Sequence, residues 1–242
     1  MPPDRRRLVL YSGGQERRNR LIHESLLDLA LRRGGPAVRD RIRMTYVPFT
    51  AEGARPFFRR FVQRYSRFGA TDFHCIAPDD PLLASDDAQR RRVLADVMAS
   101  DVVYLAGGNT FYFLHHLRTS GLLESVSHFA RRGGVVAGLS AGGLLMTPHI
   151  GLAAYPDFDR DDDEIGMSRR ARRALGLVDF EFFPHFRRSK RYRKALAAYS
   201  ERSGRALYAC RDGSGIVVEG DRFTAHGEVW LYDRGQERKI GG

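Results

Sequence analysis

A chain of 242 residues is long enough to bury a substantial core, and we expect a single domain spanning residues 1–242. Its 40 Lys and Arg residues outnumber its 29 Asp and Glu residues and give a formal net charge of +11. Because the arginines are scattered through many segments, we favour a solvated basic surface and expect no nucleic-acid partner, which leaves nucleic-acid binding a minor alternative.

Apolar strands alternate with amphipathic helices in the first part of the chain. Strands are predicted over residues 8–11, 41–49, 71–77 and 101–106 and in the run before Ser140. Helices are predicted over residues 19–32, 54–68 and 86–100 and in two stretches after Thr110. The second helix carries apolar side chains at helical spacing, and we expect them in the core: Phe57, Phe58, Phe61, Val62, Tyr65 and Phe68. Strands separated by such helices imply parallel crossovers and an α/β fold with a doubly wound sheet.

Regular patterning is lost between residues 147 and 166, where acidic residues concentrate at 155–164. We interpret this segment as a solvated loop, because it lacks the glycine and terminal glutamate of a calcium-binding EF-hand loop. Further on, the sequence predicts a strand over 177–183 and a helix over 189–203. Short strands joined by Gly and Asp turns follow, and we expect them as antiparallel additions at one sheet edge near the C-terminus: 206–210, 215–219, 222–226 and 228–232.

The stretch Gly138-Leu139-Ser140-Ala141-Gly142 has the Gly-x-Ser-x-Gly pattern of a nucleophile elbow, a sharp turn that exposes a serine between a strand and a helix. Glycines two residues on either side of the serine remove Cβ atoms that would collide in so tight a turn. Ser140 is therefore the candidate nucleophile. The alternative is a glycine-rich turn without chemistry.

A serine hydroxyl needs a base, usually a histidine that is held by a carboxylate. Most of the eight histidines fall within predicted helices or strands, where a packed or surface role is expected, and His149 stays open as an alternative. His185 follows a buried strand and a proline, at the same end of the sheet as Ser140. Ligands of doubly wound sheets bind beyond this end of the strands, so we predict His185 as the base.

Three stretches together resemble the signature motifs of the peptidase E and cyanophycinase family of serine peptidases, in the same order and at similar spacing. They are Gly107-Gly108-Asn109-Thr110, Gly138-Leu139-Ser140-Ala141-Gly142 and Pro184-His185-Phe186. The resemblance extends over about Leu8 to Val218. It implies a three-layer sandwich of helices around a mostly parallel sheet, related to class I glutamine amidotransferase-like domains.

The same resemblance implies that the chain hydrolyses small Asp-X peptides through an acyl-enzyme on Ser140, with His185 as base. The backbone N–H groups of Gly108 and Ala141 would form the oxyanion hole. The family places the third member of the triad after the nucleophile helix, which here points to Asp157, with Asp159 as second choice.

Substrate binding is expected from Asn109 and from a cation for the aspartyl carboxylate, for which Arg191 is the best match by position. The scheme requires neither a cofactor nor a metal, and a homodimer is left open. Two alternatives remain: hydrolysis of an aspartate-arginine polymer or another acyl substrate, and a catalytically silent relative that binds a ligand or partner.

The two cysteines, Cys75 and Cys210, are isolated and match neither a zinc motif nor a disulfide framework, so a reducing, cytoplasmic setting fits them best. The apolar run at residues 8–11 ends at Ser12-Gly13-Gly14, which is too short for the core of a signal peptide. No window approaches the roughly 20 apolar residues that a membrane span needs, and we expect no membrane association.

Overall fold

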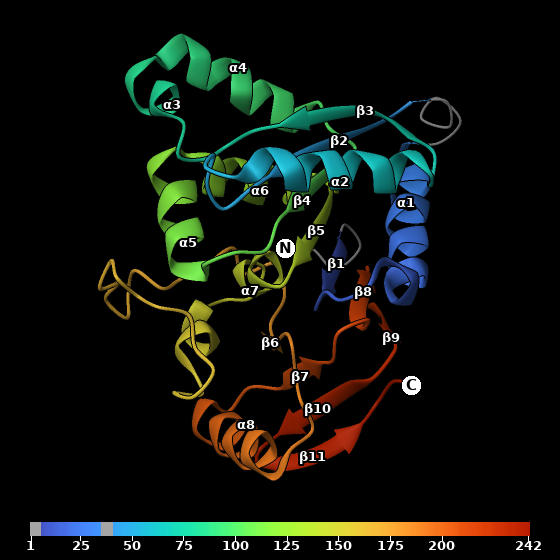
Figure 1. The fold of residues 1–242 in the computed structure, drawn as a ribbon, viewed down its shortest axis with the longest axis vertical. Helices are drawn as coiled ribbons and strands as arrows, with labels where there is room; N and C mark the ends of the chain where they lie inside the picture. Colours follow the sequence, from blue (N-terminus) through green and yellow to red (C-terminus); the bar gives the residue numbers. More distant parts are fainter. Residues whose placement is uncertain (1–5, 35–40) are drawn as a thin grey trace.

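The structure, a computed structural model, describes residues 6–34 and 41–242 (Figure 1). Within these residues seven strands form the main sheet, in the order β3-β2-β4-β5-β1-β8-β9. Its strands are β1 (Arg7–Tyr11), β2 (Ile42–Val47), β3 (Ala70–Cys75), β4 (Val102–Leu105), β5 (Val135–Leu139), β8 (Gly215–Glu219) and β9 (Arg222–His226). Strands β1 to β5 are parallel, and β8 pairs antiparallel with β1 and with β9. The predicted α/β fold with a mostly parallel sheet is confirmed.

Helices cover both faces of the main sheet. The helices of the described residues are α1 (Arg20–Gly34), α2 (Ala54–Ser66), α3 (Pro81–Ser85), α4 (Asp87–Met98), α5 (Thr110–Thr119), α6 (Leu122–Arg131), α7 (Ala141–Leu145) and α8 (Lys190–Ser203), with 3₁₀ turns η2 (Glu16–Asn19) and η4 (Ile150–Ala154). Of these, α8 packs against the second sheet described below. Alternate residues of β1 enter different cores, as the two-residue period of a strand requires. Leu8 and Leu10 pack in the core that α5 and α6 share, and Val9 and Tyr11 pack in the core with α1 and α2.

A second, four-stranded sheet lies at the opposite end of the long axis from α4 (Figure 1). In the described chain its order is β11-β10-β7-β6, from β6 (Glu181–Phe183), β7 (Leu207–Cys210), β10 (Val229–Asp233) and β11 (Gln236–Lys239). Only β8 and β9 extend the main sheet, so the expectation that all late strands do so is wrong. Strand β6 is also shorter than predicted, and β11 was not expected. Pairing of β6 with β7 is parallel, which matters for the site below.

The aromatic face of α2 is only partly a core face. Phe61 and Tyr65 are buried, and the Phe61 ring lies 4.9 Å from that of Tyr104 on β4. Phe57 is 59% exposed, and Arg60 of the same helix lies over its ring. The prediction of a core position is therefore wrong for Phe57. Among the described helices, none is both long and apolar enough to cross a membrane.

Candidate active site

The turn that carries Ser140 joins β5 directly to α7. Ser140 has φ 51° and ψ −109°, a backbone conformation that residues with a side chain rarely adopt. A Cβ atom on Gly138 would lie 2.4 Å from the carbonyl carbon of Gly142, and one on Gly142 would lie 2.2 Å from the backbone oxygen of Leu105. Both flanking glycines are thus required by close backbone approach, as the motif predicts.

The Ser140 hydroxyl lies at one end of a short hydrogen-bonded chain. Its Oγ is 2.8 Å from Nε2 of His185, and Nδ1 of the same imidazole is 2.7 Å from Oδ1 of Asp212. A carboxylate only accepts hydrogen bonds, so Nδ1 of His185 carries the proton. In the neutral ring Nε2 then holds a free lone pair, and it faces the serine hydroxyl. This tautomer is the one in which the imidazole can take a proton from Ser140.

Ser12, which follows β1, ties the histidine and the carboxylate together. Its buried hydroxyl accepts a hydrogen bond from the backbone N–H of His185 at 2.7 Å and donates one to Oδ1 of Asp212 at 3.1 Å. His185 has φ 54°, so the base, like Ser140, sits on backbone that is held in the left-handed region. Such strained backbone conformations persist only where surrounding contacts stabilise them. Here the hydrogen bond from the His185 N–H to Ser12 is one of those contacts.

The carboxylate beside His185 comes from a different loop than expected. Asp212 follows β7, which runs parallel to β6, the strand that leads to His185, so the two residues leave the sheet at the same end. Asp157 has an 89% exposed side chain, 3.9 Å from Arg160. Asp159 accepts a hydrogen bond from the Tyr192 hydroxyl at 2.6 Å. The expectation of Asp157, or of Asp159 as second choice, beside His185 is therefore wrong.

A cavity of about 120 Å³ opens beside Ser140 and His185, and Gly108 forms part of its wall. Gly108 has φ +144°, and a Cβ atom there would lie 2.1 Å from the ring of Phe49. Only glycine fits this position. In the described chain, the N–H groups of Gly108 and Ala141 donate to no protein acceptor. Ala141 is the first residue of α7, where N–H groups lack partners within the helix.

The acidic segment forms another wall of this cavity, to which Asp159, Arg160 and Asp161 contribute. Asp161 accepts a hydrogen bond from the backbone N–H of Thr110 at 2.8 Å. Burial, followed by the hydrogen bond to Asp159, raises the pKa of Tyr192 to about 12. The phenol therefore stays protonated at neutral pH and keeps donating to that carboxylate. Of the three cavity residues, Arg160 presents the positive charge.

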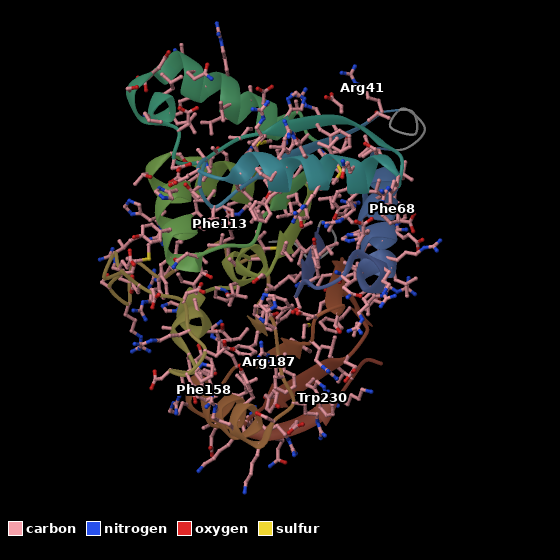
Figure 2. The ribbon with its side chains drawn as sticks, viewed as in Figure 1. Arg41, Phe68, Phe113, Phe158, Arg187 and Trp230 are labelled. Atoms are coloured by element: carbon pink, nitrogen blue, oxygen red, sulfur yellow. The ribbon has the colours of Figure 1, made fainter. Side chains whose placement is uncertain are left out.

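The two residues expected to bind substrate have other contacts. The Asn109 side chain caps α5 by accepting from the backbone N–H groups of Phe111 and Tyr112, and its amide nitrogen donates to the backbone oxygen of Asp162 at 2.9 Å. Arg191 belongs to α8, and its guanidinium lies 3.4 Å from the centre of the Phe158 ring. Figure 2 shows Phe158 beside this helix. Neither Asn109 nor Arg191 lines the cavity beside Ser140.

Sequence comparison places the chain in a known family. Residues 8–226 match the family model of Peptidase family S51. The chain belongs to peptidase family S51. The family resemblance read from the three motifs is thus confirmed. Within residues 6–34 and 41–242, no group of three or more His, Cys, Asp or Glu side chains is placed to hold a metal ion.

The chain matches curated relatives over part of their length. An uncharacterized peptidase of Pasteurella multocida is 33% identical over 87 residues, which cover 36% of this chain and 40% of the relative. Peptidase E of Streptomyces coelicolor is 29% identical over 158 residues, 59% of each chain. The aligned region therefore spans between 40% and 59% of the length of these two relatives.

Solved structures share the fold over nearly the whole chain. A peptidase from an acI-B1 actinobacterium superposes with a TM-score of 0.71 at 17% identity, covering 98% of this chain and 94% of that one. A putative peptidase E protein of Listeria monocytogenes gives a TM-score of 0.61 at 18% identity, covering 91% and 97%. At these identities the likeness shows a shared fold and no more.

Proposed function

We propose that this S51 chain is a serine-type peptidase that cleaves peptide bonds through an acyl-enzyme on Ser140. The observation that carries the proposal is the pair of hydrogen bonds that join Ser140 to His185 at 2.8 Å and His185 to Asp212 at 2.7 Å. Hydroxyl, imidazole and carboxylate in this order are the groups that activate a serine for attack on a carbonyl carbon.

In the proposed reaction, Nε2 of His185 takes the proton of the Ser140 hydroxyl as Oγ attacks the scissile carbonyl. Asp212 stabilises the imidazolium that forms. The unpaired N–H groups of Gly108 and Ala141 stabilise the oxyanion, and removal of one such donor in comparable enzymes lowers the rate about 100- to 1,000-fold. His185 then gives the proton to the leaving amine, and water hydrolyses the acyl ester by the same steps.

For substrate preference we propose an aspartyl residue before the scissile bond, in keeping with the resemblance to peptidase E. Arg160 supports this choice, because it lines the cavity beside Ser140. Asp159 is occupied by the Tyr192 hydroxyl and Asp161 by the backbone N–H of Thr110. Asp157 lies 3.9 Å from Arg160 with an exposed side chain, a weak surface pair that a substrate carboxylate would replace. A guanidinium binds a carboxylate with two parallel hydrogen bonds, which suits recognition of an aspartyl side chain. Arg160 thus replaces Arg191 as the proposed partner of the substrate.

The test is the release of amino acid from Asp-X, Glu-X, Asn-X and β-aspartyl-arginine dipeptides by the wild type, by Ser140→Ala and by a control variant. Ser66→Ala is a suitable control, because Ser66 is an exposed residue at the end of α2. We expect cleavage of Asp-X, its loss in Ser140→Ala and its retention in the control. A fluorophosphonate should label Ser140 in the wild type. Equal cleavage by Ser140→Ala would refute the proposed nucleophile, and cleavage of β-aspartyl-arginine alone would favour a cyanophycinase-like substrate.

A further inference from the structure

A second pocket, of about 420 Å³, also has His185 in its wall. His185 and Asp212 line it, but Ser140 does not. The rest of its wall is strongly basic, with Arg18, Arg187 and Arg188 among the contributors. In the view of Figure 2, Arg187 lies near β6 and β7 of the second sheet, and Trp230 lies below it on β10. The same histidine thus lines both the small cavity that contains the serine and a larger cationic pocket.

Two of the pocket's arginines are held by acidic partners. Arg211 donates to both carboxylate oxygens of Glu228, at 2.9 and 3.0 Å. Arg188 lies 3.4 Å from Glu237 and over the ring of Trp230, at 4.2 Å from its centre. Glu237 is shared, because Arg193 also pairs with it. These ion pairs fix the walls and leave positive charge in excess.

The remaining two arginines, Arg18 and Arg187, pair with no carboxylate among the described residues. Arg18 is placed by the loop that carries Asp212. Gly213 has φ +89°, and a Cβ atom there would lie 2.7 Å from Cβ of Arg18, so the stem of Arg18 crosses the loop where only glycine fits. Asp212 is the carboxylate that faces the pocket, and it is engaged by His185 and Ser12. Two cations are therefore available to an anion.

The position of the pocket identifies which part of a substrate reaches it. The histidine that takes the serine proton must give it to the leaving amine, so the leaving residue lies against the imidazole. The Gly108 and Ser140 side of the ring holds the acyl part of the substrate in the proposed reaction. The leaving amine lies at Nε2 of His185, and the rest of the leaving residue can extend past the imidazole to the pocket that contains Arg18 and Arg187.

We propose that this pocket binds a carboxylate of the leaving amino acid, which makes the enzyme selective for acidic or free C-terminal residues after the scissile bond. The inference rests on the proposed peptidase function. A carboxylate of the leaving residue comes from either its α-carboxyl group or its side chain, and guanidinium groups recognise both in the same way.

The test compares kcat/KM on four substrates that share the residue before the bond and differ in the leaving group: alanine, aspartate, lysine and alaninamide. Wild type is compared with Arg18→Gln, Arg187→Gln, the double variant and Arg17→Gln. Arg17 is a matched control, because it neighbours Arg18 on η2, contacts Gln15 and is absent from the pocket wall. We expect aspartate to be preferred over lysine by about tenfold, a preference that the double variant loses and Arg17→Gln keeps.

The pattern of rates separates the two sources. If kcat/KM falls only for the alaninamide substrate, the bound group is the α-carboxylate. If kcat/KM is higher for the aspartate substrate than for the alanine substrate, the bound group is the side-chain carboxylate. Equal kcat/KM on all four substrates would refute the proposal that this pocket binds a carboxylate of the leaving residue. A preference for aspartate that survives in the double variant would refute it as well.

A binding measurement distinguishes failure of the pocket proposal from failure of the proposed peptidase function. Calorimetric titration of free aspartate, with alanine as reference, is performed on Ser140→Ala protein with and without the two arginine substitutions. Aspartate binding that depends on Arg18 and Arg187 supports the pocket even if no peptide is cleaved. Aspartate that binds no better than alanine overturns it even if peptides are cleaved.

Discussion

Replacement of Asp212 by asparagine tests the arrangement around His185 most directly. Asparagine keeps the size of the side chain and the acceptor oxygen, but it removes the negative charge that lies 2.7 Å from Nδ1. It also introduces an N–H₂ group, which favours the imidazole tautomer with the proton on the wrong nitrogen. The fold should survive, because Asp212 is half exposed and lies in a loop.

The size of the effect follows from burial. In a triad whose aspartate is buried, the same replacement lowers kcat about 10⁴-fold. The Asp212 side chain is 51% exposed, so water screens part of its charge while its orienting role persists. We therefore expect kcat to fall about 10²- to 10³-fold, which corresponds to about 3 to 4 kcal/mol of transition-state stabilisation.

The assay is steady-state hydrolysis of an Asp-X dipeptide by Asp212→Asn, with Asp157→Asn as the matched control. Asp157→Asn removes the same charge from an exposed turn and should leave kcat within a factor of two of the wild type. If Asp157→Asn instead abolishes turnover while Asp212→Asn retains it, the reasoning from the hydrogen-bond geometry is refuted.

Three further changes probe the supports of the site and the core. Ser12→Ala leaves the partly buried backbone N–H of His185 without its acceptor, so urea denaturation should show a loss of about 1 kcal/mol in the free energy of unfolding. Gly108→Ala drives a methyl group into the Phe49 ring at φ +144°, and activity should fall at least tenfold in the dipeptide assay. Burial raises the pKa of Glu181 to about 7, although the nearby charge of Arg205 acts in the opposite direction. Because the folded state favours the protonated carboxyl, the contribution of Glu181 to stability is complete below pH 4.5 and is lost as the pH rises to about 7. Glu181→Gln should remove that loss, which amounts to about 3 kcal/mol at pH 8, as measured by denaturation across this range.

Each of these expectations has a contrary result. An unfolding free energy of Ser12→Ala equal to that of the wild type would mean that water replaces the hydroxyl. Full activity of Gly108→Ala would show that the Phe49 ring moves aside freely. Parallel stability curves for Glu181→Gln and wild type between pH 4.5 and 7 would contradict the buried position of that carboxyl.

Local patterns in the sequence sufficed for the parallel sheet and for Ser140. The alternation of strands and helices is repeated over many residues, and the glycines around Ser140 belong to a five-residue motif that can be read directly from the sequence. His185 was also within reach, because the rule that places functional residues beyond the ends of parallel strands uses one strand at a time.

Asp212 was missed because it depends on strand pairing between distant segments. The late strands were all expected to be antiparallel, but β6 and β7 pair in parallel. Residues that follow parallel neighbours emerge side by side, so the same rule applied to the strand over 206–210 would have pointed to Asp212. Burial of Phe57 was wrongly predicted for a related reason: helical spacing identifies a face but not how far the sheet extends beneath it.

Strand β1 pairs with β5 on one side and with β8 on the other. The first strand of the described chain therefore gains its second neighbour only after β8, one of the last strands, has been synthesised. Between the synthesis of β1 and that of β8, the chain adds Ser140, then His185 and finally Asp212. A chain that is still being synthesised therefore carries its nucleophile well before the loop between β7 and β8 has left the ribosome. In the proposed mechanism, hydrolytic competence arrives only near the end of translation, when most of the domain has already folded.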